Sequence, residues 1–328
     1  MKKLVFVFIA LIFINLASAQ TKREAGRSAD YDRLTVLEDS IARLAKIAVQ
    51  DSLPEDRQVA NDRLLLLMRE ALALPNAFAF PFSKIENMSI QQPKDGTFRL
   101  FTWQLCVDEN TYRYFGFLQL NRSKPVFYEL NNALSDISKP EKETLETDRW
   151  FGCVYYNLKE FKTKDGMKYL LFGYNANNAD EHIKVCDVLV LRGSTARFGA
   201  PVFEIADIAG RKKERLHRLV LTYAADVVVR LNFDAELGFI IHDHLQEIAA
   251  KNPNQPFTYV PDGTYESFEL KKDIWEHVDK VPTQVLSDGQ APRPTPILDK
   301  KRKMTKEDVK GFKFPTKEEQ DEQSKIKN

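Results

Sequence analysis

The sequence has few of the residues and none of the motifs that mark the common enzymes and metalloproteins. Its 328 residues include three Cys and five His, and neither HExxH nor a Cys–His cluster with zinc-finger spacing occurs. A GxSxG elbow, a P-loop and a GxGxxG after a strand are also absent. No motif therefore assigns the chain to a catalytic class, and the sequence predicts no cofactor.

Cysteine is too scarce and too irregular for a disulfide framework. Cys106, Cys153 and Cys186 are an odd set, which cannot pair completely within one chain. All three fall in segments with a β pattern, where a small apolar thiol packs easily. We expect buried free thiols, and one disulfide with one thiol left over is the alternative. A Cys153 nucleophile served by His182 or His217 is the less favoured interpretation.

Long hydrophobic runs are missing except at the N-terminus. Lys2 and Lys3 precede the stretch Leu4–Leu16, which is apolar apart from Asn15 and is followed by Ala17-Ser18-Ala19. That stretch is well short of the ~20 residues that cross a bilayer, and the small-x-small pattern before Gln20 suits signal peptidase. We expect residues 1–19 to be a cleaved signal peptide, which predicts a periplasmic or secreted protein without a transmembrane segment in the mature chain.

An excess of charge of either sign is also missing. The 48 Lys and Arg face 47 Asp and Glu, and removal of residues 1–19 changes the formal net charge from +1 to −1. Nucleic-acid partners select a concentrated basic surface. We therefore expect no nucleic-acid partner, and an envelope protein or a glycan is the expected partner class.

Residues 20–75 have the pattern of a helical hairpin. Apolar residues recur at intervals of three and four, as on one helix face: Leu34, Leu37, Ile41, Leu44 and Ala48, and then Leu64, Leu67, Met68, Ala71 and Leu72. Ser52 to Glu55 fits a capping box, and Pro75 ends the second helix. Two short helices offer too few heptads for a partner-binding coiled coil, so we expect them to pack against the rest of the protein.

Residues 76–281 predict a β domain. They hold 30 of the 36 aromatic residues of the chain, which suit a pleated, half-buried surface. About twelve short apolar runs are separated by turn residues, including Asp165-Gly166 and Asp262-Gly263 as hairpin-type turns. No amphipathic helix separates the runs. The fold class is therefore mainly β, an antiparallel meander closed as a barrel, folded as a sandwich or divided into propeller-like blades.

One motif occurs twice within this domain. The pattern Y-x-x-F-G-[FY]-x-x-x-N occupies residues 112–121 and again 169–178. A Gly within a strand permits a bulge or the close approach of a neighbour, and a terminal Asn suits a turn. We interpret the two copies as equivalent strands of duplicated units, and Gly116 and Gly173 as their matched positions.

The C-terminal residues 282–328 predict a disordered tail. Four of the first fifteen are proline, and the remainder is highly charged with few apolar residues. Such a composition buries too little surface to offset the entropy of the chain.

Several blocks in the β domain carry a resemblance to known sequences. In chain order they are FRLFTWQL, YRYFGFLQL, WFGCVYYN, YLLFGYNANN, RFGAPVFE and TYVPDGTYESFEL. With these blocks the chain resembles a family of uncharacterised, exported, β-rich proteins of Bacteroidota, over roughly residues 76–281. The resemblance implies export and a β-rich fold and carries no activity. Asn175 stands where the family pattern more often has an acid, which weakens the transfer of a cation site.

Two groups of residues are candidates for a site. Asn175, Asn177, Asn178 and Asp180 could offer oxygens to a ligand such as Ca²⁺, although the leading Asp and the Gly of an EF-hand loop are missing; a plain turn is the favoured alternative. His242 and His244 are two residues apart, so on a strand they point to one face and could begin a metal site. The third ligand would come from elsewhere, for example His217 or Asp243; a solvated histidine pair is the favoured alternative.

Taken together, the patterns favour a non-enzymatic exported envelope protein, a binding or structural module with an aromatic β surface. The alternative is a secreted hydrolase that acts on glycans or peptides, with acids gathered in a β cleft.

Overall fold

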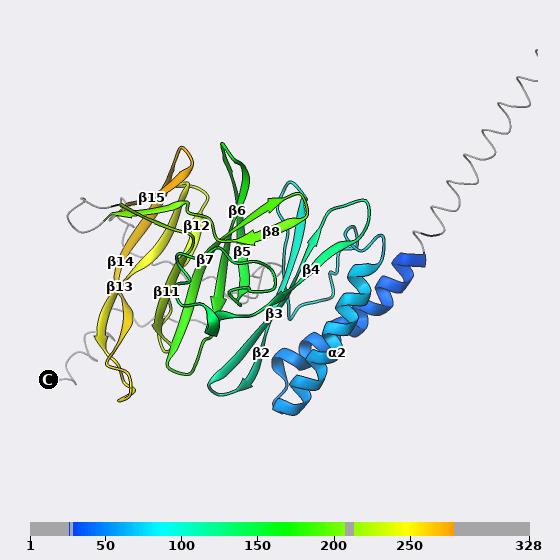
Figure 1. Ribbon diagram of the computed structural model, residues 1–328. Coiled ribbons are helices and arrows are strands. Elements are labelled where there is room, and N and C mark those ends of the chain that lie inside the picture. The colour runs from blue at the N-terminus through cyan, green and yellow to red at the C-terminus, as the bar shows by residue number, and fades with distance from the viewer. Residues whose placement is uncertain (1–25, 27–28, 207–212, 279–328) are drawn as a thin grey trace, which may run out of the picture. The chain divides into compact units, whose positions relative to one another are not determined.

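The computed structural model describes residue 26 and residues 29–206 and 213–278. The expected signal peptide and the expected disordered tail lie outside these residues. Within them, a two-helix unit precedes fifteen strands in three sheets, none of which is closed (Figure 1). The mainly β class is thus confirmed, with fifteen strands in three open sheets where about twelve strands in a meander were expected, and without closure as a barrel.

The helical hairpin is confirmed and packs on the first sheet. A helix spans residues 29–50 and α2 spans Pro54–Ala73, where Pro54 opens the helix without a side-chain cap. The predicted capping box is therefore not formed. The apolar faces of both helices share one buried cluster with Trp103 and Phe117 of the first sheet, and Trp103 donates its indole hydrogen to Asn61 at 2.8 Å. In the described residues, no helix has the length and apolar character of a membrane span.

The first sheet has the order β1-β2-β3-β4. Its strands are β1 Ser89–Gln91, β2 Phe98–Asp108, β3 Thr111–Leu120 and β4 Val126–Asn131. A short 3-10 helix, η1 Leu134–Asp136, follows β4.

The second sheet, which we call the middle sheet, has the order β11-β7-β6-β5, with β8 paired to β7. Its strands are β5 Val154–Thr163, β6 Gly166–Asn175, β7 Glu181–Arg192, β8 Thr195–Phe198 and β11 Leu219–Ala224. Thr163 pairs with Gly166 across a tight turn, as the Asp165-Gly166 prediction requires.

The third sheet, which we call the outer sheet, has the order β10-β9-β15-β14-β13-β12. Its strands are β9 Phe203–Ala206, β10 Lys213–Leu216, β12 Leu231–Asp234, β13 Phe239–Ala249, β14 Phe257–Lys271 and β15 Ile274–Val278. The pairing of β15 with β9 is parallel, whereas every other strand pair described is antiparallel.

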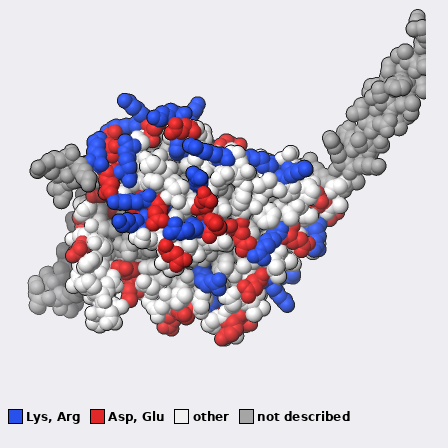
Figure 2. Space-filling model, in the orientation of Figure 1, with Lys and Arg blue, Asp and Glu red and all other residues white. Residues whose placement is uncertain are grey.

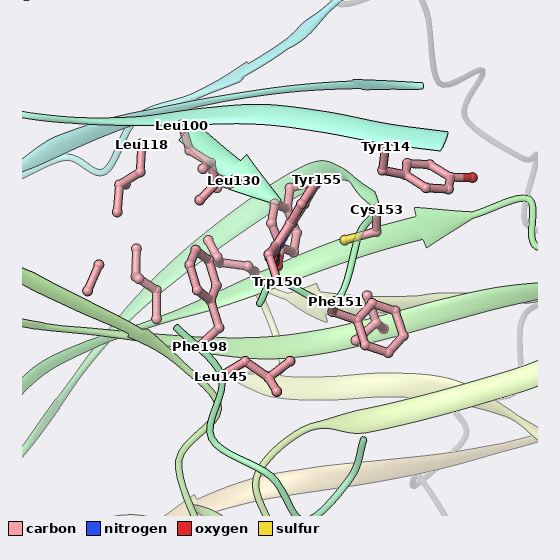
Figure 3. Packing of buried hydrophobic residues seen from close by; sticks show 14 of the residues in the cluster. Leu100, Tyr114, Leu118, Leu130, Leu145, Trp150, Phe151, Cys153, Tyr155 and Phe198 are labelled. Atoms are coloured by element: carbon pink, nitrogen blue, oxygen red, sulfur yellow. Dashed lines mark hydrogen bonds between the residues drawn. The ribbon is translucent and has the colours of Figure 1, made fainter. Parts of the chain in front are cut away.

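The middle sheet is covered on both faces. Alternate residues of β6 divide between two buried clusters: Tyr169 and Leu171 pack toward the first sheet, whereas Leu170 and Phe172 pack toward the outer sheet. A strand buried on both faces reads as a continuous apolar run instead of an alternating one, which explains the sequence YLLF. The cluster shared with the first sheet gathers Trp150, Phe151, Tyr155 and Phe198 (Figure 3).

The two copies of the repeated motif occupy corresponding places. Gly116 lies on β3 and Gly173 on β6, and each strand is the middle one of a three-stranded antiparallel meander. By strand alternation both glycines face the cluster between the first and middle sheets. A Cβ added to Gly116 would lie 2.7 Å from the Phe101 carbonyl oxygen, and one added to Gly173 would lie 2.6 Å from the Cys153 sulfur. Both positions therefore depend on the absence of a side chain.

The Asp262-Gly263 prediction was wrong in one respect. These residues do not end a strand; they form a bulge inside β14, where the register with β13 shifts between Asp243 and Leu245. Asp262 accepts a hydrogen bond from the Thr264 amide at 2.8 Å, and Gly263 has a φ of +89°. The local turn chemistry was read correctly, but a bulge absorbs such a turn without ending the pairing.

Candidate metal centre

Three neighbouring strands of the outer sheet bring two histidines and a glutamate together. His242 on β13 and Glu266 on β14 are direct cross-strand partners, and His277 on β15 pairs with Phe268, two residues along from Glu266. The three side chains each offer one donor atom, and these atoms lie within 4.8 Å of one another. The Oε2 atom of Glu266 is 3.6 Å from Nε2 of His242 and 3.1 Å from Nε2 of His277.

His242 has the tautomer that a metal ligand needs. Its Nδ1 lies 2.9 Å from the backbone carbonyl oxygen of Asp243, which can only accept, so Nδ1 carries the hydrogen. Burial lowers the pKa of His242 from its ordinary value, which favours the neutral ring. The Nε2 lone pair then faces the carboxylate of Glu266, an unfavourable approach that a cation between the two atoms would turn into two favourable contacts.

His244 lies two residues after His242 on β13 and also has one ring nitrogen near a hydrogen-bond acceptor and the other near Glu266. Its Nδ1 lies 2.8 Å from Oδ2 of Asp262, and its Nε2 lies 3.8 Å from Oε1 of Glu266. The bulge in β14 places Asp262 there, because three β14 residues stand opposite His244 alone. A carboxylate on the far nitrogen of a histidine is a common outer-shell partner in metal sites. His244 approaches the other oxygen of Glu266 and is not one of the three clustered donors.

Glu266 is held as a carboxylate. The hydrogen bond from His277 is the main cause that lowers its pKa, against the opposing effect of burial, and the neighbouring imidazoles His242 and His244 act in the same direction. The Nε2 hydrogen of His277 faces this carboxylate, so an ion at this place would take the position of that hydrogen. A carboxylate and imidazole nitrogens are donors that zinc and similar ions prefer.

The spacing of the donors fits a tetrahedral ion. Ligand atoms at about 2.0–2.1 Å from a tetrahedral Zn²⁺ lie about 3.3 Å from one another. The two distances from Glu266, 3.6 Å and 3.1 Å, bracket that value. The third pair, His242 and His277, lies within 4.8 Å, so one ion could bind all three atoms if the two imidazoles moved closer together.

The cluster opens onto a hollow between the outer sheet and β11. The hollow has a volume of ≈ 290 Å³ and is lined by the three clustered residues and by Glu141, Ile205, Ala206, Leu216, Leu219, Val220, Leu221 and Phe268. Apart from Glu141, the remaining lining residues are apolar. A metal ion held by the cluster would thus lie beside the apolar lining of this open hollow.

One part of this centre was predicted from the sequence, and the other part was not. His242 and His244 both approach Glu266, as a shared strand face requires. The third ligand was expected from His217 or Asp243, but His217 lies 2.9 Å from Thr144 and Asp243 accepts from the Arg230 amide. Glu266 and His277 were missed because the order of strands in a sheet is not readable from local pattern. Alternation within the runs YESFEL and IWEHV is the signal that could have placed them.

The residues 175–180 form a turn in which the side chains of Asn175, Asn178 and Asp180 have partners within the protein. Asn175 is buried and donates to the Gly152 carbonyl at 2.6 Å. Asn177 has a φ of +48°, Asn178 accepts from the Asp180 and Glu181 amides, and Asp180 accepts from Asn252. Ligand binding by these four residues stays a prediction, and their geometry gives it no support.

The three cysteines are free, and two of them are buried: Cys153 and Cys186 are shielded, whereas Cys106 is partly exposed. Burial raises the pKa of the Cys153 and Cys186 thiols well above the ordinary value, which is the opposite of an activated nucleophile. The expectation of free thiols is confirmed for all three residues. The expectation that they are buried is wrong for Cys106 alone, which lies near the end of β2.

The comparisons with known proteins assign this chain to no family. No protein-family model, curated protein or solved structure matches this chain.

Proposed function

We propose that this protein is an exported, non-enzymatic binding protein of the cell envelope whose centre, His242, Glu266 and His277, holds a zinc-type divalent ion. The observation that carries the proposal is the approach of the His242 Nε2 lone pair to the Glu266 carboxylate, with Nδ1 committed to a backbone carbonyl. A cation is the species that both atoms would bind at once.

The proposed binding site is the hollow and not an aromatic surface. The large aromatic side chains lie mainly in the buried clusters, and all three tryptophans are at most 1% exposed. Figure 2 shows acidic and basic side chains interspersed over the face in view. The aromatic content of the sequence therefore supports packing, and it is the polar cluster beside the apolar hollow that supports binding.

The test is a titration of the metal-free mature protein with Zn²⁺, followed by calorimetry and thermal denaturation. We expect one ion per chain and an upward shift in Tm that a chelator reverses, because a ligand that binds the folded state stabilises it. His242→Ala and His277→Ala should each weaken binding at least about 100-fold. His182→Ala, which changes a histidine packed between Tyr174 and Tyr223, is the matched control and should bind as the parent does. Absence of stoichiometric binding by the folded parent would refute the proposal.

The alternative, a secreted hydrolase, has one observation in its favour. Two histidines and a glutamate with a position left for water form the protein donor set of several hydrolytic zinc enzymes. Assays of the zinc-loaded protein against peptide and glycoside substrates separate the two functions. Turnover that disappears in Glu266→Gln would favour the hydrolase over the binding protein.

Export is part of the proposal and is tested separately. N-terminal sequencing of the protein recovered from outside the cytoplasm should begin at Gln20. Recovery of membrane-bound protein that still begins at Met1 would contradict cleavage after Ala19.

A further inference from the structure

We propose that the ion of this centre keeps one coordination position toward the hollow, and that a small monocarboxylate with a hydrocarbon body completes the coordination there. The inference rests on the proposed metal binding and names the ligand class of the same site.

The open position follows from the number of donors. In the described residues, the cluster contributes three donor atoms, one each from His242, Glu266 and His277. A tetrahedral ion takes four. His244 faces the other oxygen of Glu266 and is not among the residues that line the hollow, whereas the three donors all line it. The fourth ligand therefore comes from the hollow.

The charge of the centre selects a monoanion. Two neutral imidazoles and one carboxylate leave a divalent ion with a net charge of +1. One carboxylate from the ligand makes the centre neutral, which is the favourable state beside an apolar wall of low dielectric. A dianion such as a phosphate monoester would leave an excess negative charge there, and Glu141 on the same wall adds to the repulsion.

The wall selects a hydrocarbon body of modest size. The wall offers the aliphatic and aromatic surface of Ile205, Leu216, Leu219, Leu221 and Phe268. The volume of ≈ 290 Å³ lies just below the range typical of small-molecule sites, about 300–1,000 Å³. A short or medium-length acyl chain would cover this wall while its carboxylate reaches the ion. A water molecule alone would bind the ion but leave the apolar wall uncovered.

The test uses the mature protein loaded with Co²⁺, whose visible absorption reports a change of ligand at the ion. Acetate, butyrate, hexanoate and hexyl phosphate are the probes. We expect carboxylates to change the spectrum, with affinity rising roughly three- to four-fold for each methylene that enters the hollow, and hexyl phosphate to bind more weakly than hexanoate. Metal-free protein should bind hexanoate far less tightly.

A wall variant and its control complete the experiment. Leu221→Asn should retain Co²⁺ binding and lose the dependence on chain length, whereas Leu237→Asn, at a residue that is 45% exposed, should leave both unchanged. Retained Co²⁺ affinity shows that the Leu221 variant is folded. If Co²⁺ binds but hexanoate is no tighter than acetate, this inference fails while the metal centre stands. If Co²⁺ and Zn²⁺ both fail to bind, the proposed function fails and takes the inference with it.

Discussion

Arg218 and Asp187 form an ion pair of 3.1 Å in which both side chains are completely shielded from solvent. Arg218 also donates to the carbonyl oxygens of Phe198 at 2.9 Å and Glu143 at 3.0 Å, and Asp187 accepts from the Tyr155 hydroxyl at 3.3 Å. The pair thus joins β7 to the loop segments around it. Burial of two charges is acceptable here because their hydrogen bonds are supplied by fixed partners.

Removal of one member of this pair should be costly. Arg218→Met leaves the Asp187 charge buried without a counter-ion, which we expect to lower the free energy of unfolding by about 3–5 kcal/mol. Urea denaturation measures the change. The double variant Arg218→Met, Asp187→Leu should recover a large part of the loss, because no charge is then stranded. A double variant as unstable as the single one would show that packing, and not the charge, sets the cost.

The two motif glycines should not tolerate a side chain. Gly116→Val and Gly173→Val each place a Cβ within 2.7 Å of a neighbouring atom, so we expect overpacking to cost roughly 1–3 kcal/mol of stability. Chemical denaturation of both variants gives the values. Asn177→Gly is the control, because Asn177 already has a positive φ that glycine adopts without strain. Valine variants as stable as the parent would end the interpretation of matched strand positions.

The partly buried position of Lys184 should make stability depend on pH in the alkaline range. Its amine lies 4.3 Å from the ring centre of Tyr156, and burial lowers its pKa to about 8. Between about pH 8 and the ordinary value of 10.5, the unfolded chain binds more protons than the folded one, so stability should rise with pH through this window. Below about pH 8 the full cost of the buried charge is present.

Lys184→Met isolates this contribution. We expect the variant to be more stable than the parent at pH 7 and the difference to shrink as pH approaches 10.5, since the parent then loses its buried charge. Urea denaturation of both proteins from pH 7 to 10.5 tests this. A difference that stays constant over the range would mean that Lys184 does not titrate as its surroundings require.

The three thiols should react at two different rates. Cys106 is partly exposed and donates weakly to the Asp108 carbonyl at 3.2 Å, whereas the raised pKa and the burial of Cys153 and Cys186 suppress the thiolate that reacts. Ellman's reagent should modify one thiol of the native protein quickly and all three only after unfolding. Fast modification of all three in the folded protein would contradict the packing around Cys153.

Local sequence pattern predicted the fold correctly where the residues adjacent along the chain determine the conformation of a segment. Apolar residues three and four apart gave the helical hairpin, because Leu34, Leu37 and Ile41 fall on one face whatever they pack against. Aromatic and β-branched runs gave the strands, and Asp165-Gly166 gave the tight turn between β5 and β6. The bulge at Asp262 was misread as a strand end because local turn chemistry does not reveal whether a partner strand continues beside it.

Only part of the candidate centre could be predicted from local sequence pattern. The sequence by itself determined that His242 and His244 would share a strand face, since a period of two is built into the strand. Only the tertiary structure decided that β14 and β15 lie beside β13, which brings Glu266 and His277 to His242. It also decided that residues of β9, β10, β11 and β14 form the apolar lining beside them. Strand order depends on the summed burial of whole faces against one another and not on the residues of any one strand. Residues 24 and 35 positions after His242 along the chain therefore reach one candidate site through packing alone.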